Sequence, residues 1–311
     1  MIESMELRDK VLSNLAARGQ AGAAWLRDLP EVIRRLETDW DIRVGRTFAN
    51  ATEAYVAEAV TTDGAQVALK IPIVGLAKAD REARVLRAAS GRGYVRLLRH
   101  DASSGSMLLE RLGLQLAQLG RPKDEEVMII CSTLGRAWMQ ALPELRLPTG
   151  AEKASEMASY IASVWLKVGK PCSEKTIEVA MRFAKARVDA FDPATAVVSH
   201  GDAHAWNTLH DPVTGDYKFV DPDGWFVERA HDLSISMREG CAEFLTGNPV
   251  ALGRSRCALL SRLTGVDSDA IWQWGFIETL VNGLSYLEIG PKENAAQFLS
   301  VADAWAEAEV V

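Results

Sequence analysis

The sequence has few cysteines and no apolar run of the length that a membrane span needs. Its four cysteines, Cys131, Cys172, Cys241 and Cys257, are far apart and form no Cys-x-x-Cys pair. This spacing argues against a disulfide framework and a cysteine zinc site, so we expect reduced thiols. No stretch reaches roughly 18 apolar residues, and the first ten residues carry charge where a secretory signal needs an apolar segment. We therefore predict a cytoplasmic protein that has no membrane partner.

Positive charge is also scarce relative to negative charge. The chain contains 35 Lys and Arg against 42 Asp and Glu, which gives a formal net charge of −7. This balance disfavours nucleic acid as a partner and permits a cationic substrate. Its 311 residues exceed one comfortable hydrophobic core, and the 48% hydrophobic content is ordinary for a globular protein. We therefore expect two lobes.

The first part of the chain predicts a small sheet that carries one helix. Residues 1–40 show the apolar spacing of helices and predict an N-terminal helical extension. Alternating segments follow, separated by turn residues, and a helix at about 76–90 interrupts them. The predicted strands, which we expect to be antiparallel, are 41–48, 54–60, 65–71, 94–98 and 106–110.

The rest of the chain predicts a larger, mostly helical lobe. The apolar pattern changes near Leu112-Gly113, so we place a lobe boundary between residues 1–112 and 113–311. Together the two patterns predict an α+β protein. The helices expected in the second lobe are 123–142, 151–168, 173–190, 229–246, 250–263, 268–289 and 293–309.

Two segments of the second lobe combine carboxylates and an amide in a fixed order. Asp202 follows His200-Gly201, Asn207 lies five positions after Asp202, and Asp221 follows an apolar pair. In small-molecule kinases, one Asp holds the acceptor hydroxyl, while an Asn and a second Asp hold Mg²⁺ on the nucleotide phosphates. A lone Asp-x₄-Asn is more often a capped turn, but the flanking residues favour the kinase interpretation. We expect Asp202 to be catalytic, and Asn207 and Asp221 to bind the metal.

A lysine and a glutamate in the first lobe fit the same chemistry. Lys70 lies on the third predicted strand, and Glu82 follows twelve residues later in the predicted helix. A strand-end lysine usually points to water, but a glutamate in the next helix can hold its ammonium near phosphate oxygens. Asp80 and Glu53 are alternative partners for this lysine. The loop 46–53 lacks the Gly-x-Gly-x-x-Gly pattern, although its small residues permit close approach to phosphates.

Two other functional classes remain open at this point. The candidate ligands of a metal-dependent hydrolase are His200, Asp202, His204, His231 and Asp232. That interpretation leaves Lys70, Glu82 and Asn207 unexplained. A non-catalytic nucleotide-binding protein would normally have lost one of the catalytic residue types, and none is lost here. We expect His200 to hydrogen-bond the backbone through a neutral ring and to have no direct catalytic role.

With these residues placed, the chain resembles the aminoglycoside phosphotransferase superfamily, a protein-kinase-like group that includes choline kinases and antibiotic kinases. Within it, the chain is most similar to the streptomycin 6-phosphotransferase and hydroxyurea kinase branch. The resemblance covers about residues 40 to 300. The matching residues are Val67-Ala68-Leu69-Lys70, Glu82, His200-Gly201-Asp202, Asn207 and Asp221.

The resemblance implies a bilobal fold, with a five-stranded antiparallel lobe that carries one helix and binds nucleotide, and a helical lobe that carries the catalytic loop. It implies ATP and Mg²⁺ as cofactors, with Asp202 as catalytic base and Lys70 on the α- and β-phosphates. Backbone groups of Glu110 and Leu112 would contact adenine. The family counterpart of Asp232 braces the catalytic loop.

The resemblance further implies an ATP-dependent O-phosphotransferase for a small-molecule acceptor. We expect a streptomycin-type aminoglycoside and hence a role in antibiotic resistance; the alternative is a metabolic kinase for a sugar, amino alcohol or other small hydroxyl compound. Trp206 and Trp225 are candidates for an apolar wall of the acceptor pocket. Glu228 and Glu239 are candidate carboxylates for a cationic acceptor, although acidic helix residues usually face water.

Overall fold

The computed structural model describes residues 9–48, 53–73, 78–140 and 143–309 of the chain. The chain divides into two compact units, which are Met1–Gly113 with Asp211–Asp216, and Leu114–His210 with Tyr217–Val311. The first division falls after Gly113, one residue beyond the boundary that the sequence predicts. The short segment Asp211–Asp216 groups with the first unit, although it follows the boundary in sequence.

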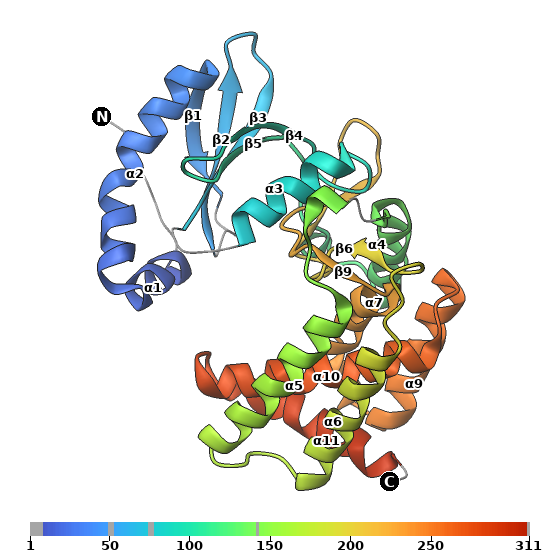
Figure 1. The fold of residues 1–311 in the computed structure, drawn as a ribbon. Coiled ribbons are helices and arrows are strands. Elements are labelled where there is room, and N and C mark those ends of the chain that lie inside the picture. Colours follow the sequence, from blue (N-terminus) through green and yellow to red (C-terminus); the bar gives the residue numbers. More distant parts are fainter. Residues whose placement is uncertain (1–8, 49–52, 74–77, 141–142, 310–311) are drawn as a thin grey trace. The chain divides into compact units, whose positions relative to one another are not determined.

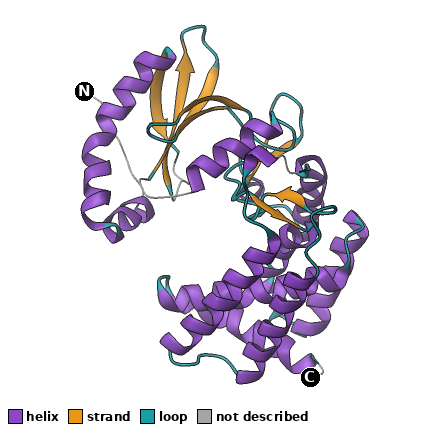
Figure 2. Cartoon of the chain, in the orientation of Figure 1, coloured by secondary structure: helices purple, strands orange, loops and turns teal. Residues whose placement is uncertain are grey.

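The first unit contains the predicted five-stranded antiparallel sheet (Figures 1 and 2). The strand order is β1-β2-β3-β5-β4, and helix α3 (Lys78–Ala89) connects β3 to β4. The predicted strand 94–98 is wrong in its bounds: the strand is Leu97–Asp101, and the buried Tyr94 and Val95 precede it, after a turn in which Gly91 and Gly93 have positive φ. The strands are β1 (Ile42–Thr47), β2 (Ala54–Thr61), β3 (Gln66–Pro72), β4 (Leu97–Asp101) and β5 (Ser106–Glu110).

The helices α1 (Asp9–Ala17) and α2 (Gly19–Trp40) precede the sheet and share its core (Figure 1). Side chains of α2 recur at helical spacing and are buried with residues of β2 and β3 in one hydrophobic cluster. The indole Nε1 of Trp25 also donates to the carbonyl of Pro72 at 2.8 Å. The predicted helical extension is therefore part of the folded first unit.

The second unit is mostly helical, with α10 (Ser268–Glu288) at its centre (Figure 2). Trp272, Trp274 and Phe276 of this helix are fully buried. None of the helices in the described part of the chain has the length and apolar character that crossing a membrane requires. The other α-helices are α4 (Lys123–Ala137), α5 (Gly150–Lys167), α6 (Glu174–Asp189), α7 (Arg229–Arg238), α8 (Cys241–Phe244), α9 (Pro249–Thr264) and α11 (Ala295–Ala308), and the 3₁₀ turns are η1 (Leu116–Leu119), η2 (Pro143–Leu145) and η3 (Lys292–Asn294).

Two predicted helices of this unit are shorter than expected. The predicted helix 229–246 ends at Arg238 and restarts as α8 (Cys241–Phe244) after Gly240. The ring of Phe244 packs so closely on Gly240 that a Cβ there would lie 2.5 Å from it, so a larger residue would not fit at this break. The predicted helix 123–142 ends at Ala137, where Trp138 adopts an extended conformation. The indole of Trp138 is then free of the helix and donates to a buried carboxylate.

Four short strands in the second unit were missed by the sequence analysis. β6 (Val197–Ser199) pairs with β9 (Trp225–Val227), and β7 (Thr208–His210) pairs with β8 (Tyr217–Phe219). Three residues are too few to display an alternating apolar pattern. These two ladders hold both polar segments that the sequence analysis selected, because residues 200–207 connect β6 to β7 and residues 220–224 connect β8 to β9.

Candidate active site

The two polar segments of the second unit are hydrogen-bonded to each other. The amide of Val220 donates to the carbonyl of Asn207 at 3.0 Å, and the amide of Asp223 donates to the carbonyl of His200 at 2.7 Å. Gly201 has φ +86°, and a Cβ at this position would lie 2.8 Å from the Cβ of Asp223. Only glycine permits this approach without strain, so the two segments form one closely packed catalytic loop region.

His200 holds this region together through both of its ring nitrogens. Nε2 donates to the carbonyl of Val220 at 2.8 Å, and Nδ1 accepts from the amide of Asp202 at 3.1 Å. This pattern requires the neutral Nε2–H tautomer. Burial of the ring also lowers the pKa of His200. The predicted neutral, backbone-bonded His200 is confirmed, and its nitrogens are not positioned as ligands of a hydrolase metal.

Asp232 braces the same region from helix α7. Its Oδ2 accepts from the amide of His200 at 3.0 Å and from the indole of Trp138 at 2.9 Å. Its Oδ1 accepts from the amide of Gly201 at 2.7 Å. A fully buried carboxylate is costly unless it is well hydrogen-bonded, and these three donors satisfy that requirement. The expected bracing role of Asp232 is therefore confirmed.

The carboxylate of Asp202 lies between two nitrogen donors. Oδ1 lies 2.8 Å from Nη2 of Arg238, and Oδ2 lies 3.2 Å from Nε2 of His204. Burial raises the pKa of Asp202, but the hydrogen bond from His204 and the charge of Arg238 outweigh burial and hold the pKa well below its usual value. Asp202 is therefore ionised at neutral pH and able to accept a hydrogen bond.

His204 has no role in the kinase site that the sequence predicts, and Arg238 is not among the predicted site residues. His204 lies two residues after Asp202, so its proximity was a readable signal. Arg238 lies 36 residues from Asp202 on a separate helix. Because helix residues of this kind usually face water, nothing in the local pattern marked it.

Asn207 and Asp221 provide oxygen donors of the kind that Mg²⁺ prefers. The amide Nδ2 of Asn207 donates to the backbone carbonyl of Asp202 at 3.1 Å, which assigns Oδ1 as the acceptor end of the side chain. Asp221 adopts a left-handed conformation, with φ +59°, two residues after the end of β8. One amide oxygen and one carboxylate are a hard donor set, which fits Mg²⁺ with its remaining positions on water and phosphate.

The described residues do not form the alternative metal site of a hydrolase. Across the ranges that the structure describes, no group of three or more His, Cys, Asp or Glu side chains is arranged to hold a metal ion. His231, one of the proposed ligands, is fully buried and lies 3.2 Å from Glu278 of α10. The proposed His and Asp ligands therefore do not converge.

Lys70 and Glu82 form the predicted ion pair in the first unit. Nζ of Lys70 lies 2.7 Å from Oε1 and 2.6 Å from Oε2 of Glu82, and both side chains are buried. The pair joins β3 to α3. Its geometry confirms the predicted pairing, while the contact of Lys70 with phosphates stays a prediction. Residues 49–52 of the predicted phosphate loop lie outside the described residues.

The predicted adenine-contacting segment follows strand β5. Glu110 is the last residue of β5, and its amide donates to the carbonyl of Arg96 at 3.0 Å. Its Oε1 accepts from the amide of Arg96 at 2.8 Å. Leu112 is buried two residues later. The adenine contacts of both residues stay predictions.

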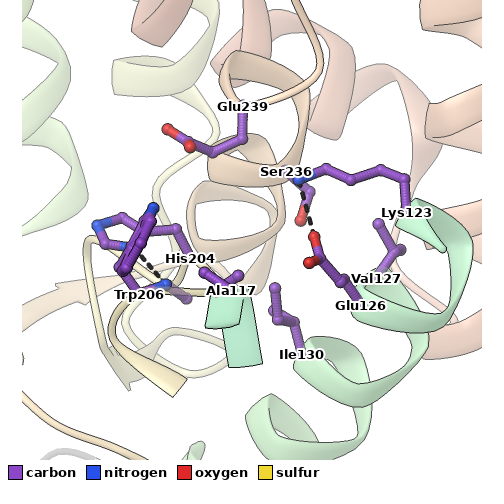
Figure 3. A pocket seen from close by; sticks show the side chains of 11 residues that line it. Ala117, Lys123, Glu126, Val127, Ile130, His204, Trp206, Ser236 and Glu239 are labelled. Atoms are coloured by element: carbon purple, nitrogen blue, oxygen red, sulfur yellow. Dashed lines mark hydrogen bonds and ion pairs between the residues drawn. The ribbon is translucent and has the colours of Figure 1, made fainter. Parts of the chain in front are cut away.

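A pocket of about 230 Å³ adjoins the catalytic loop within the second unit (Figure 3). His204 and Trp206 line it from the loop, Ser236 and Glu239 from the end of α7, and Glu126 from α4. Glu126 is buried and lies 3.0 Å from Nζ of Lys123, an ion pair drawn in Figure 3. The pocket therefore combines carboxylates with an aromatic ring.

The structure brings two of the four predicted acceptor-site residues to this pocket. Trp206 is 49% exposed and lines it together with Glu239 (Figure 3). Trp225 is buried elsewhere, with Nζ of Lys153 lying 4.5 Å from the centre of its ring.

Glu228, the fourth predicted acceptor-site residue, also lies away from the pocket lining. It pairs with Arg187 at 3.0 Å and accepts from the indole of Trp274 at 2.8 Å. These contacts give Glu228 a structural task in the helical core.

Residues 40–290 match the family described as aminoglycoside/hydroxyurea antibiotic resistance kinase. The chain is 26% identical to streptomycin 6-kinase of Streptomyces griseus over 296 residues, which cover 93% of each protein. It is 32% identical to hydroxyurea phosphotransferase of Kitasatospora aureofaciens over 294 residues, which cover 92% of this chain and 81% of that protein. A choline kinase structure from Streptococcus pneumoniae aligns with a TM-score of 0.61 at 15% identity, over 90% of this chain and 99% of the other. This likeness shows the protein-kinase-like fold.

Proposed function

The chain belongs to the aminoglycoside/hydroxyurea antibiotic resistance kinase family, and on this premise we propose that it phosphorylates a hydroxyl group of a streptomycin-type aminoglycoside with ATP as donor. Membership makes the chain a phosphotransferase that acts on hydroxyl groups. The streptomycin 6-kinases of two Streptomyces species, at 26% and 25% identity, support the choice of acceptor. Such an activity would confer resistance to the antibiotic.

The observation that carries this proposal is the ionised Asp202 carboxylate beside the pocket. His204 donates to Asp202 and also lines the pocket, so an acceptor bound there would lie next to the carboxylate. Asp202 would accept the hydrogen bond of the hydroxyl and orient its oxygen toward phosphorus. Because the pKa of Asp202 is low, the carboxylate is a weak base. This supports proton transfer late in the reaction, when the oxygen is already bonding to phosphorus.

The remaining charged residues would bind the nucleotide and its metal ion. Asn207 and Asp221 would hold Mg²⁺ through oxygen atoms, and Lys70 would contact phosphate oxygens while Glu82 orients its ammonium. When bound, ATP would supply the phosphoryl group, and Mg²⁺ would neutralise the charge that develops on its oxygens.

The chemistry of the pocket supports a polar, cationic acceptor. Glu126 and Glu239 line the pocket; Glu126 is paired with Lys123, which also lines it, and Glu239 with Arg238. Their carboxylates would also accept hydrogen bonds from positive groups of an acceptor, and Trp206 offers a flat apolar surface. Ser236 is 4% exposed, and its Oγ has no hydrogen-bond partner among the described residues. A buried hydroxyl without a partner is unfavourable, so a polar group of the acceptor would stabilise this site.

Hydroxyurea is the second candidate acceptor. The observation that favours it is the 32% identity to a hydroxyurea phosphotransferase, which exceeds the 26% identity to a streptomycin kinase. A metabolic kinase for another small hydroxyl compound is the remaining alternative, because the fold itself does not determine the acceptor.

An acceptor panel with a catalytic variant tests the proposal. Phosphorylated product is measured with streptomycin, hydroxyurea, choline and glucose, for the native protein and for Asp202→Ala. We expect product with streptomycin, and a loss of about a thousandfold in Asp202→Ala with ATP affinity unchanged. Product with hydroxyurea alone would select the second candidate. Turnover of none of the acceptors, or full activity of Asp202→Ala, would overturn the proposal.

A further inference from the structure

Arg238 places its guanidinium among three carboxylates at the end of α7. Nη2 lies 2.8 Å from Oδ1 of Asp202 and 3.1 Å from Oε1 of Glu239. Nη1 lies 3.7 Å from Oε2 of Glu278, a residue of α10. The side chain of Arg238 is only 14% exposed. The arginine therefore links the central helix of the second unit to the catalytic loop.

Glu278 contacts the arginine through the nitrogen that does not contact Asp202. Glu278 is buried, and its Oε1 lies 3.2 Å from Nε2 of His231. Burial raises the pKa of Glu278, but the interaction with His231 and the positive charges of Lys153 and Arg238 outweigh burial and lower the pKa to about 2. Glu278 is thus a fixed negative charge in the core, and it attracts the guanidinium that touches Asp202.

His204 fixes the other oxygen of Asp202. Its Nδ1 accepts from the amide of Trp206 at 3.2 Å (Figure 3), so Nδ1 carries no proton and Nε2 is the donor. This Nε2 lies 3.2 Å from Oδ2 of Asp202. Asp202 therefore has one donor on each oxygen, which prevents rotation of the carboxylate. Each oxygen retains a further lone pair for an acceptor hydroxyl.

We propose that Arg238 is a positioning residue for phosphoryl transfer: held by Glu278, it fixes the Asp202 carboxylate in the orientation that receives the acceptor hydroxyl. This inference rests on the proposed function and extends it to a residue that no sequence motif marks. A planar guanidinium can contact Asp202 and Glu278 with different nitrogens, whereas the single ammonium of a lysine cannot reproduce that geometry. Orientation matters because small displacements of a catalytic group reduce the rate strongly.

The first test is Arg238→Lys, which keeps the positive charge and removes the planar guanidinium with its separate nitrogen donors. Streptomycin phosphorylation and acceptor-free ATP hydrolysis are measured side by side. We expect kcat for phosphorylation to fall between roughly ten- and a hundredfold. The KM for ATP and the rate of ATP hydrolysis should remain unchanged, because neither depends on an oriented acceptor hydroxyl. A loss of folding alone would instead reduce both rates together.

Arg256→Lys is the matched control. Arg256 is also a buried arginine of the second unit; its Nη2 lies 2.7 Å from Oε2 of Glu243, and its Nη1 donates to the backbone carbonyl of Ser236 at 3.4 Å. We expect this variant to leave the ratio of phosphorylation to hydrolysis unchanged. Glu278→Gln provides a second variant in case Arg238→Lys does not fold. It should also lower kcat for phosphorylation, but by a smaller factor than Arg238→Lys.

A double-mutant cycle tests whether Arg238 acts through Asp202. In the Asp202→Asn background, Arg238→Lys should cause no further loss of phosphorylation, because the group that it orients is already inactive. An equal loss in both backgrounds, or a kcat of Arg238→Lys within about twofold of native, would overturn the inference. Full activity of Asp202→Ala would instead overturn the proposed function, so the two failures are distinguishable.

Discussion

The Lys70 pair in the first unit and the Asp202 cluster in the second handle charge in different ways. In the first, the ammonium of Lys70 contacts both oxygens of the buried Glu82 carboxylate. In the second, the carboxylates of Asp202, Glu239 and Glu278 share the guanidinium of Arg238. The difference teaches that the pair serves to hold one cation in place. The cluster, by contrast, retains excess negative charge, which suits a metal ion and a cationic acceptor.

Removal of the lysine tests the pair in the first unit. If Lys70 contacts the phosphates as proposed, Lys70→Met should lower kcat by about a hundredfold or more, because it deletes a charge that would stabilise the transferring phosphoryl group. It should also destabilise the fold by about 3–5 kcal/mol, since Glu82 is then buried without its cation. Steady-state kinetics and urea denaturation measure the two effects.

The double variant Lys70→Met with Glu82→Leu separates stability from catalysis. Replacing both partners of a buried pair by apolar residues is often neutral for stability. We therefore expect stability to recover while kcat stays low. Recovery of activity together with stability would show that Lys70 acts only by stabilising the fold and has no direct role in catalysis.

Glu278→Gln tests whether the buried charge of Glu278 stabilises the protein, through the dependence of stability on pH. The folded-state pKa of Glu278 is about 2, below its ordinary value of 4.5, so its contribution to stability is present above pH 4.5 and is lost as the pH falls toward 2. This shift corresponds to about 3 kcal/mol. At neutral pH the variant should be less stable than the native protein by about that amount, and the gap should close in acid.

Urea denaturation between pH 3 and 7 measures this gap. The control is Glu178→Gln on α6, whose side chain is exposed and whose stability curve should parallel that of the native protein. A gap between native and Glu278→Gln that stays constant with pH would show that Glu278 stabilises the cluster by packing rather than by charge.

The same contrast explains what the sequence could predict. The Lys70 pair is local, since twelve residues and one strand-to-helix connection separate its partners. The catalytic loop is also local, so Asp202, Asn207 and their neighbours were readable as a motif. Arg238 and Glu278 come from α7 and α10, and only tertiary packing brings them to Asp202. Strands β6 to β9 were missed for a related reason, because three-residue strands depend on their partners rather than on their own pattern.

The smallest expected effects are those of replacing two serines of α7, Ser234 and Ser236, which lie two residues apart. The Oγ of Ser236 has no partner in the part of the chain that the structure describes, whereas the buried Oγ of Ser234 donates to the carbonyl of His231 at 2.6 Å. Ser234→Ala should therefore cost about 1 kcal/mol of stability and leave the KM for streptomycin unchanged. Ser236→Ala should leave stability unchanged and raise that KM about fivefold, because the acceptor loses one hydrogen bond. If both variants behave like Ser234→Ala, the hydroxyl of Ser236 serves the helix packing, and the acceptor contacts of the pocket come from its carboxylates and Trp206 alone.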